Sequence, residues 1–274
     1  MNAHTTIGSQ THRVGGSAGS QLLALTRRSL VKTARAPQLL MFSLMMPMSM
    51  LVLFSQVFRS VSHSPDFPRG VAYIDYLTPA LLAVSTVMSA TNSGVALASD
   101  LSDGLLDRLR AMHVSRTGVL LARIVTDALL TVVRTVLLGG IAAFLLGFRL
   151  HGDTAHTLLA VAVLVPLSVA MSALFLLIGS RLRQPELVQT AGMMVMMPFM
   201  FISSAFAPLK TMPDWLGATA AVNPVSHATD ATRALVLGGS DLHAAALTLG
   251  TSVGLATVSV LLAAREMNAT RNQR

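Results

Sequence analysis

Three ionisable residues, Arg123, Asp127 and Arg134, lie on one face of a long apolar stretch of the chain. On a helix with 3.6 residues per turn, their spacing places them within about 40° of one another. Charged groups at bilayer depth are costly, so they usually pair or face a protein interior or a water-filled cavity. Two interpretations follow: Arg123 reaches the membrane surface and pairs with Asp127, or the three residues serve a translocation path or a subunit seam.

Methionines form a second pattern, because ten of the sixteen fall in two apolar stretches. Flexible thioethers suit a surface that repacks against varied apolar ligands, although they also serve as lipid-facing filler. Five methionines are therefore further candidates for the translocation path or the seam: Met45, Met46, Met193, Met196 and Met197.

The sequence lacks common catalytic and nucleotide-binding motifs. It contains no G-x-x-x-x-G-K-[ST] phosphate-binding loop, no H-E-x-x-H zinc motif and no G-x-S-x-G nucleophile motif. It has no cysteine, and its eight histidines lack the spacing of metal ligands. We therefore predict no catalytic residue, no metal site and no cofactor bound by this chain.

The composition indicates a membrane protein. Hydrophobic residues make up 53% of the 274 positions and charged residues 12%, against roughly 25% charged residues in an average soluble domain. The net charge of +8 is dispersed between apolar stretches rather than clustered with aromatic residues. The expected surroundings are therefore lipid, and no nucleic-acid partner is predicted.

The apolar stretches predict an all-α integral membrane fold with about six transmembrane helices, each near the ~20 residues that a bilayer requires. Residues 1–20 are expected to be a disordered tail, 21–36 an interfacial amphipathic helix, 37–264 the membrane domain and 265–274 a short C-terminal tail. The expected spans are residues 37–58, 73–99, 119–148, 156–179, 187–207 and 243–264.

Two connections between these spans carry structure of their own. Residues 100–117 place acids first and bases last along an amphipathic pattern, which predicts a helix that begins at Asp100 as its cap. Residues 207–241 are semi-apolar but contain three prolines, so they predict short re-entrant helices rather than a span. In this second region, Trp215, Asn223 and Pro224 are candidate site residues, with Trp215 at the membrane interface.

The basic residues predict the topology. With the N-terminus inside, fourteen of them lie on the cytoplasmic side and five outside, which favours a multi-pass protein with both termini cytoplasmic. In the last span, Gly250 and Gly254 form a small-xxx-small pair, for which packing within the chain or dimerisation is the expected role.

Two blocks of sequence resemble a known family. Residues 100–116, DLSDGLLDRLRAMHVSR, followed by 121–127, LARIVTD, resemble the signature region of ABC exporter permeases of the second type. Residues 203–216, SSAFAPLKTMPDWL, followed by 222–235, VNPVSHATDATRAL, are similar to the daunorubicin-resistance branch of those permeases. One departure is His113, which stands where many relatives carry proline.

The resemblance implies two six-helix subunits around a central path in the bacterial inner membrane, either two copies of this chain or this chain and a sister permease. Each subunit would rest a cytoplasmic coupling helix on a separate ABC ATPase subunit, which would bind ATP and Mg. The residues that would couple to the ATPase are Asp100, Asp103, Asp107, Arg108 and Arg110.

The expected function is export of an amphipathic or hydrophobic compound, drug-like or lipid, with ATP hydrolysed by the partner. One alternative is export of a lipid-linked glycan, which would favour a path lined with aromatic rings, whereas aromatic residues make up 5% of this chain. Another is a self-sufficient channel or ion-coupled transporter that uses the three charged residues. An intramembrane enzyme is a third alternative, for which the sequence offers no recognisable pair of nucleophile and base.

Overall fold

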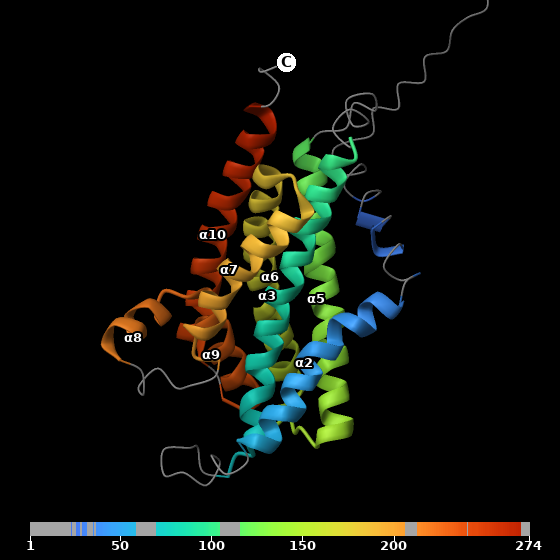
Figure 1. Ribbon diagram of the computed structural model, residues 1–274. Helices are drawn as coiled ribbons and strands as arrows, with labels where there is room; N and C mark the ends of the chain where they lie inside the picture. The colour runs from blue at the N-terminus through green and yellow to red at the C-terminus, as the bar shows by residue number, and fades with distance from the viewer. Residues whose placement is uncertain are drawn as a thin grey trace, which may run out of the picture.

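The computed structural model describes residues 23, 26–27, 29–31, 35, 37–58, 70–104, 116–205, 213–239 and 241–269. The regular structure of these residues is helical, which confirms the all-α prediction. Figure 1 shows a bundle of helices, with bounds α2 Pro37–Val57, α3 Tyr73–Ser102, α5 Arg116–Leu146, α6 Thr154–Leu182, α7 Pro185–Phe201, α8 Asp214–Ala220, α9 Pro224–Val236 and α10 Leu242–Ala269.

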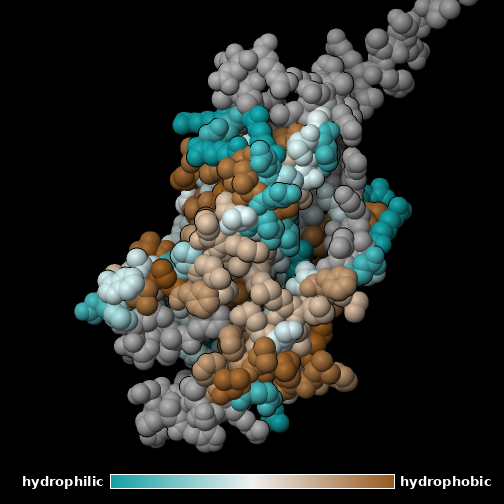
Figure 2. Space-filling view, in the orientation of Figure 1, coloured by the Kyte–Doolittle hydropathy of each residue, from teal (hydrophilic) through white to brown (hydrophobic). Residues whose placement is uncertain are grey.

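Helix α6 forms the centre of the bundle, where it packs against α3, α5, α7, α9 and α10 (Figure 1). Its apolar side chains are spread around the whole helix, as expected of a helix that is surrounded by other helices. The outer helices α2, α5 and α10 leave large apolar side chains exposed, and Phe144 of α5 has 89% of its surface accessible. Apolar residues also cover much of the face in Figure 2. An apolar outer surface of this kind fits a lipid surrounding.

Within the described residues, five helices are long and apolar enough to cross a membrane, by length and composition. They occupy Leu40–Val57, Tyr73–Ser102, Gly118–Leu146, Thr154–Leu182 and Leu242–Glu266. These five agree with the first four and the last of the spans expected from the sequence.

The remaining expected span, residues 187–207, is shorter than predicted. Helix α7 ends at Phe201, and the next residue, Ile202, leaves the helical conformation. Its 17 residues are about 25 Å long at 1.5 Å per residue, less than the ~30 Å of a hydrocarbon core. The apolar composition continues beyond Phe201, which is why hydropathy placed the end of the helix too late.

Helices α3 and α6 touch through their backbones. A Cβ atom added to Gly94 would lie 2.4 Å from the carbonyl oxygen of Phe175, and one added to Gly179 would lie 2.4 Å from that of Gly94. Only glycine permits this approach, which brings the two central helices into contact over their lengths. By contrast, Gly250 and Gly254 face open space, so no other helix of the described part of the chain packs closely against them.

The region after α7 contains two short helices, α8 and α9, and not one continuous helix, as its prolines predict. Pro224 is the first residue of α9, where proline fits because that position needs no hydrogen-bonding N–H. With 7 and 13 residues, neither helix is long enough to span a bilayer.

Several predictions lie wholly or partly outside the described residues: the tail over 1–20, most of the connection over 100–117 and the last residues of the C-terminal tail. Of the helix expected over 21–36, residues 23, 26–27 and 29–31 are helical, whereas Arg28 and Lys32 are outside the description.

Candidate functional site in the helix bundle

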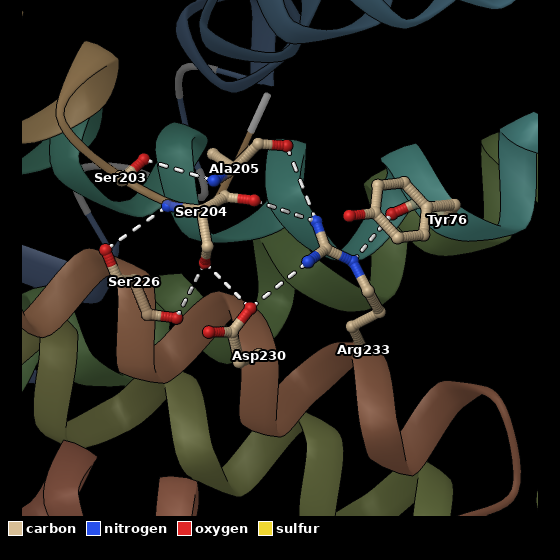
Figure 3. Close-up of polar contacts among 7 residues, drawn as sticks. All are labelled: Tyr76, Ser203, Ser204, Ala205, Ser226, Asp230 and Arg233. Atoms are coloured by element: carbon tan, nitrogen blue, oxygen red, sulfur yellow. Dashed lines mark hydrogen bonds and ion pairs between the residues drawn. The ribbon is translucent and has the colours of Figure 1, made fainter. Parts of the chain in front are cut away.

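The densest polar cluster of the described residues surrounds Arg233 of α9 (Figure 3). The guanidinium is buried and lies 3.8 Å from the centre of the Tyr76 ring on α3. Its Nε donates to the Tyr76 carbonyl at 3.2 Å, its Nη1 to Asp230 at 3.1 Å and its Nη2 to the carbonyls of Ser204 and Ala205 at 3.3 and 3.4 Å. One side chain thus joins α3, α9 and the segment that follows α7.

Ser204 completes this cluster. Its hydroxyl lies 2.7 Å from Asp230 Oδ1, and its backbone N–H donates to the hydroxyl of Ser226 at 3.2 Å. Burial raises the pKa of the Asp230 carboxyl, while the Ser204 hydroxyl and the Arg233 guanidinium oppose that rise. A buried cation is tolerated here because its donors meet a carboxylate, three carbonyls and an aromatic face.

Asn223 fixes the start of α9 to the end of α7. Its amide Nδ2 donates to the carbonyls of Phe199 and Ile202, both at 2.8 Å, and its Oδ1 accepts from the N–H of Val225 at 2.9 Å. The side chain therefore caps α9 and satisfies two carbonyls at the last turn of α7. Of the three residues predicted in this region, Asn223 and Pro224 are buried at this junction, whereas Trp215 is exposed.

The turn between α5 and α6 is held at the same end of the bundle. Buried Asp75, in the first turn of α3, accepts from the N–H of Arg149 at 2.8 Å. The N–H of His151 donates to the carbonyl of Val236 at 2.9 Å. Consecutive residues of α3, Asp75 and Tyr76, thus hold this turn and α9.

A second polar region lies inside the bundle between α3, α5 and α6. Asp127 and Arg134 face it from α5, and Thr131 between them donates to Ser168 of α6 at 2.8 Å. The hydroxyls of Ser93 and Ser172 stand close enough to Asp127 to act on its charge, yet no hydrogen bond of ordinary geometry reaches its Oδ2. We call this region the α5 seam, defined by Ser93, Asp127, Thr131, Arg134, Ser168 and Ser172.

Three buried polar atoms of the α5 seam lack a hydrogen-bond partner: Asp127 Oδ2, Arg134 Nε and Ser172 Oγ. Burying such groups without a partner raises the free energy of the folded state, because each loses its hydrogen bonds with water. The α5 seam therefore places an acceptor, a donor and a hydroxyl where each can take up a further polar partner.

Arg123 is not paired with Asp127, contrary to the first interpretation of the sequence. Its guanidinium forms an ion pair with Asp100 of α3 instead. Asp100 lies inside α3, which continues to Ser102, so the prediction that Asp100 caps the next helix is wrong. The Asp100–Arg123 pair joins the two helices that flank residues 103–115.

The other predicted coupling residues are described only in part. Asp103 is exposed at the C-cap of α3, with its N–H bonded to the carbonyl of Ser99 at 2.9 Å. Asp107, Arg108 and Arg110 lie outside the described residues.

The candidate methionines occupy two helices that both pack on α3. Met45 and Met46 of α2 and Met193 and Met197 of α7 are exposed, and Met196 packs against the largest core cluster. The exposed four are available to lipid, to a partner subunit or to an apolar substrate.

Sequence reasoning missed the cluster around Arg233, which it counted only as an outer basic residue. Arg233 takes its partners from Tyr76, 157 positions away, and from the segment after α7. The available signal was the i, i+3 pair of Asp230 and Arg233 on a helix that starts at Asn223-Pro224.

Comparison with known proteins identifies the family of this chain. The chain matches the ABC-2 type transporter family over residues 20–237. It is 29% identical over 253 residues to the daunorubicin resistance ABC transporter permease protein DrrB1 of Streptomyces coeruleorubidus. The aligned residues cover 91% of this chain and 86% of that protein. Two putative transport permeases ycf38, of Pyropia yezoensis and Porphyra purpurea, are 29% and 27% identical over 78% of this chain and 73% and 72% of theirs.

The matched residues run from before α2 to the end of α9, so they include the α5 seam, the Asp100–Arg123 pair and the Arg233 cluster. This chain therefore belongs to the ABC-2 type transporter family.

Proposed function

We propose that this chain is the transmembrane permease subunit of an ATP-driven exporter whose ATP is hydrolysed by a separate ABC ATPase. The observation that carries the proposal is the family match over residues 20–237 in a chain whose described part contains five membrane-length helices. The sequence itself offers no phosphate-binding loop, so ATP and Mg belong on the partner. The protein then resides in a bacterial inner membrane with both termini in the cytoplasm.

Energy would enter through residues 100–117. The Asp100–Arg123 pair ties α3 to α5 on either side of this connection, so a force on the connection reaches both helices. Asp103, Asp107, Arg108 and Arg110 would meet the ATPase in this arrangement. A simple interfacial strap with solvated charges is the competing role for the same residues.

The substrate would be amphipathic or hydrophobic, as the name of the daunorubicin resistance relative suggests. Exposed methionines on α2 and α7 offer an adaptable apolar surface toward a second permease subunit, the same or a sister chain. The unpaired polar atoms of the α5 seam would form hydrogen bonds with polar groups of the substrate, or with other bundle residues in a second conformation. Alternation between two conformations would bring these partners within reach.

Nucleotide hydrolysis tests this proposal. We expect the purified chain alone to hydrolyse no ATP, and its complex with the cognate ATPase to hydrolyse ATP faster when daunorubicin or a fluorescent lipid analogue is added. Robust hydrolysis by the chain alone would contradict the proposal, and so would a complex that fails to form.

An ion-coupled transporter is the second candidate, because the α5 seam buries unpaired Asp127 and Arg134 atoms as coupling groups would require. Transport by the chain alone, reconstituted without ATPase and driven by a proton or sodium gradient, would select it. We expect no such transport.

A further inference from the structure

The turn between α6 and α7 contains a residue in an unusual backbone conformation. Helix α6 ends at Leu182, and the next residue, Arg183, is left-handed with φ 54° and ψ 9°. Among the described residues, Arg183 is the one residue other than glycine with a positive φ. A side chain crowds its own backbone in this conformation, which is why glycine is common at the end of a helix. An arginine at this position therefore raises the free energy of the fold relative to glycine.

The local structure does not explain why this residue is arginine. The backbone N–H of Arg183 donates to the carbonyl of Gly179 at 3.1 Å, a bond that glycine would make equally well. Its side chain is half-buried, and Nε donates to the carbonyl of Ser180 at 3.3 Å. Within the described part of the chain, neither Nη atom of Arg183 forms a hydrogen bond or an ion pair. The guanidinium therefore keeps two nitrogen atoms available for a partner.

The turn holds this guanidinium on a short and well-anchored backbone. Only Arg183 and Gln184 connect α6 to α7, because Pro185 is already the first residue of α7. The neighbouring Arg181 is bound to Glu266 of α10, with Nε and Nη2 at 3.0 and 2.8 Å from Oε1. Three helices thus fix the position of the turn, so little conformational freedom is lost when a partner binds the Arg183 side chain.

The turn lies at the end of the bundle from which residues 100–117 leave. Figure 1 shows it at the end where α3 and α10 terminate and α5 begins. Helix α6 has 29 residues and is about 43 Å long, which matches the ~40–45 Å thickness of a bilayer with its headgroups. The turn therefore reaches the aqueous surface, where a protein bound to residues 100–117 would meet it.

We propose that Arg183 is a docking residue for the ATPase, whose surface supplies a carboxylate that accepts from the guanidinium. This inference rests on the proposed function and adds a second contact beside residues 100–117. A carboxylate is the expected partner because the planar guanidinium can donate to both of its oxygens at once. The contact would offset the strained backbone of Arg183, as at other sites where strain is retained for function. It would also transmit movement of the ATPase directly to α6, the centre of the bundle.

The substitution Arg183→Gly separates docking from folding. We expect the variant to unfold at the same or a higher denaturant concentration than the wild type, because glycine adopts φ 54° without strain. Substrate-stimulated ATPase activity of its complex should fall several-fold. Arg183→Lys should recover part of this activity, since lysine keeps the charge without the planar group. Arg149→Gln is the control: it removes another exposed arginine, in the turn between α5 and α6 at the opposite end of the bundle, and should change neither measurement.

A direct test of contact uses the absence of cysteine from the chain. We expect Arg183→Cys to react with a maleimide in the chain alone and to be protected in the complex with the ATPase. Arg149→Cys should react equally in both samples. Protection in vesicles of anionic lipid without ATPase would overturn the proposal in favour of lipid headgroups.

Two further results would overturn the proposal. Arg183→Gly with normal stimulated activity would show that the side chain is not needed for docking, and Arg183→Gly with lowered stability would assign it a structural role. Both results require a wild-type complex that assembles and is stimulated by substrate. Failure of the wild-type complex to assemble would instead contradict the proposed function itself and this inference with it.

Discussion

Arg233 is the residue on which most contacts at its end of the bundle converge. Its guanidinium satisfies carbonyls on α3 and after α7 and pairs with Asp230, so its removal leaves several buried acceptors without a donor. We expect Arg233→Leu to lower the free energy of unfolding by about 3 kcal/mol. Unfolding of the chain in mixed detergent micelles, followed by far-ultraviolet circular dichroism, measures the change.

Arg149→Leu is the matched control for this substitution, because the Arg149 side chain is exposed and only its backbone N–H contacts Asp75. It should leave the stability nearly unchanged. Adding Asp230→Asn to Arg233→Leu should recover part of the loss, since it removes the abandoned carboxylate. Equal stability of Arg233→Leu and the wild type would show that the cluster does not hold the helices together.

Arg134 tests whether the α5 seam serves transport. We expect Arg134→Leu to lower transport by the complex several-fold more than it lowers the amount of folded protein in the membrane. The reason is that its Nε is buried without a hydrogen-bond partner, so this donor is desolvated in this conformation without a compensating bond. Quantitative blots of membranes and transport rates give the two numbers, and equal losses in both would indicate a purely structural residue.

For single residues, the sequence predicted which charged side chains share a helix face but not which residues they contact. Helical spacing correctly placed Asp127 and Arg134 on one face, because that periodicity is local. It could not foresee that Arg123 pairs with Asp100, since that contact joins positions 23 residues apart across two helices. The contacts of Arg233 were missed for the same reason, because its partner Tyr76 is 157 positions away.

Among the helices, the contact between α3 and α6 depends on glycine. We expect Gly94→Ala to cost about 1–3 kcal/mol of stability, because its methyl group would overlap the Phe175 carbonyl and force the helices apart. Gly140→Ala is the control, since a Cβ there meets nothing within 4 Å and alanine favours a helix by roughly 1 kcal/mol. If both variants unfold at the same denaturant concentration, close packing at Gly94 is not important.

The Asp100–Arg123 pair offers a test of coupling at the level of helices. We expect Asp100→Arg and Arg123→Asp each to lower substrate-stimulated ATPase activity of the complex, and the double exchange to restore it, because the exchange re-forms the ion pair. Stability should change little, as this pair is partly exposed. Failure of the double exchange to restore activity would mean that the residues act separately.

Asp107 and Arg110 test the connection itself. Exchanging their charges preserves net charge and amphipathic character, so a simple interfacial strap should tolerate the change, whereas a docking helix should lose stimulated ATPase activity. Activity within about twofold of the wild type, or roughly 0.4 kcal/mol, with the complex still assembled, would count against coupling here.

Helix bounds were predicted to within three residues at α2 and α6, where an apolar stretch ends in polar or charged residues. Helix α10 continues to Ala269, five residues beyond the predicted end, through the charged residues that follow its apolar stretch. The prediction failed at α7, where Phe201 is followed by further apolar residues and the end depends on Asn223 binding the last carbonyls. Such an end is set by tertiary contacts, which hydropathy does not contain.

For the whole molecule, the topology predicted from the basic residues is directly testable because the chain contains no cysteine. We expect single cysteines at Ser64 and Ser240 to react with a membrane-impermeant maleimide in intact cells. Cysteines at Ser115 and Gln184 should react only after permeabilisation. The reverse pattern would overturn the predicted orientation.

Under the proposed function, this chain moves its substrate only when a partner ATPase supplies the energy. The direct measurement is ATP-driven uptake of a fluorescent amphipathic probe into inside-out vesicles that contain the chain with its ATPase, the chain with an ATPase whose phosphate-binding lysine is replaced, or the chain alone. We expect uptake in the first sample and none in the other two. Uptake by the chain alone, or uptake that an ion gradient drives without ATP, would contradict it.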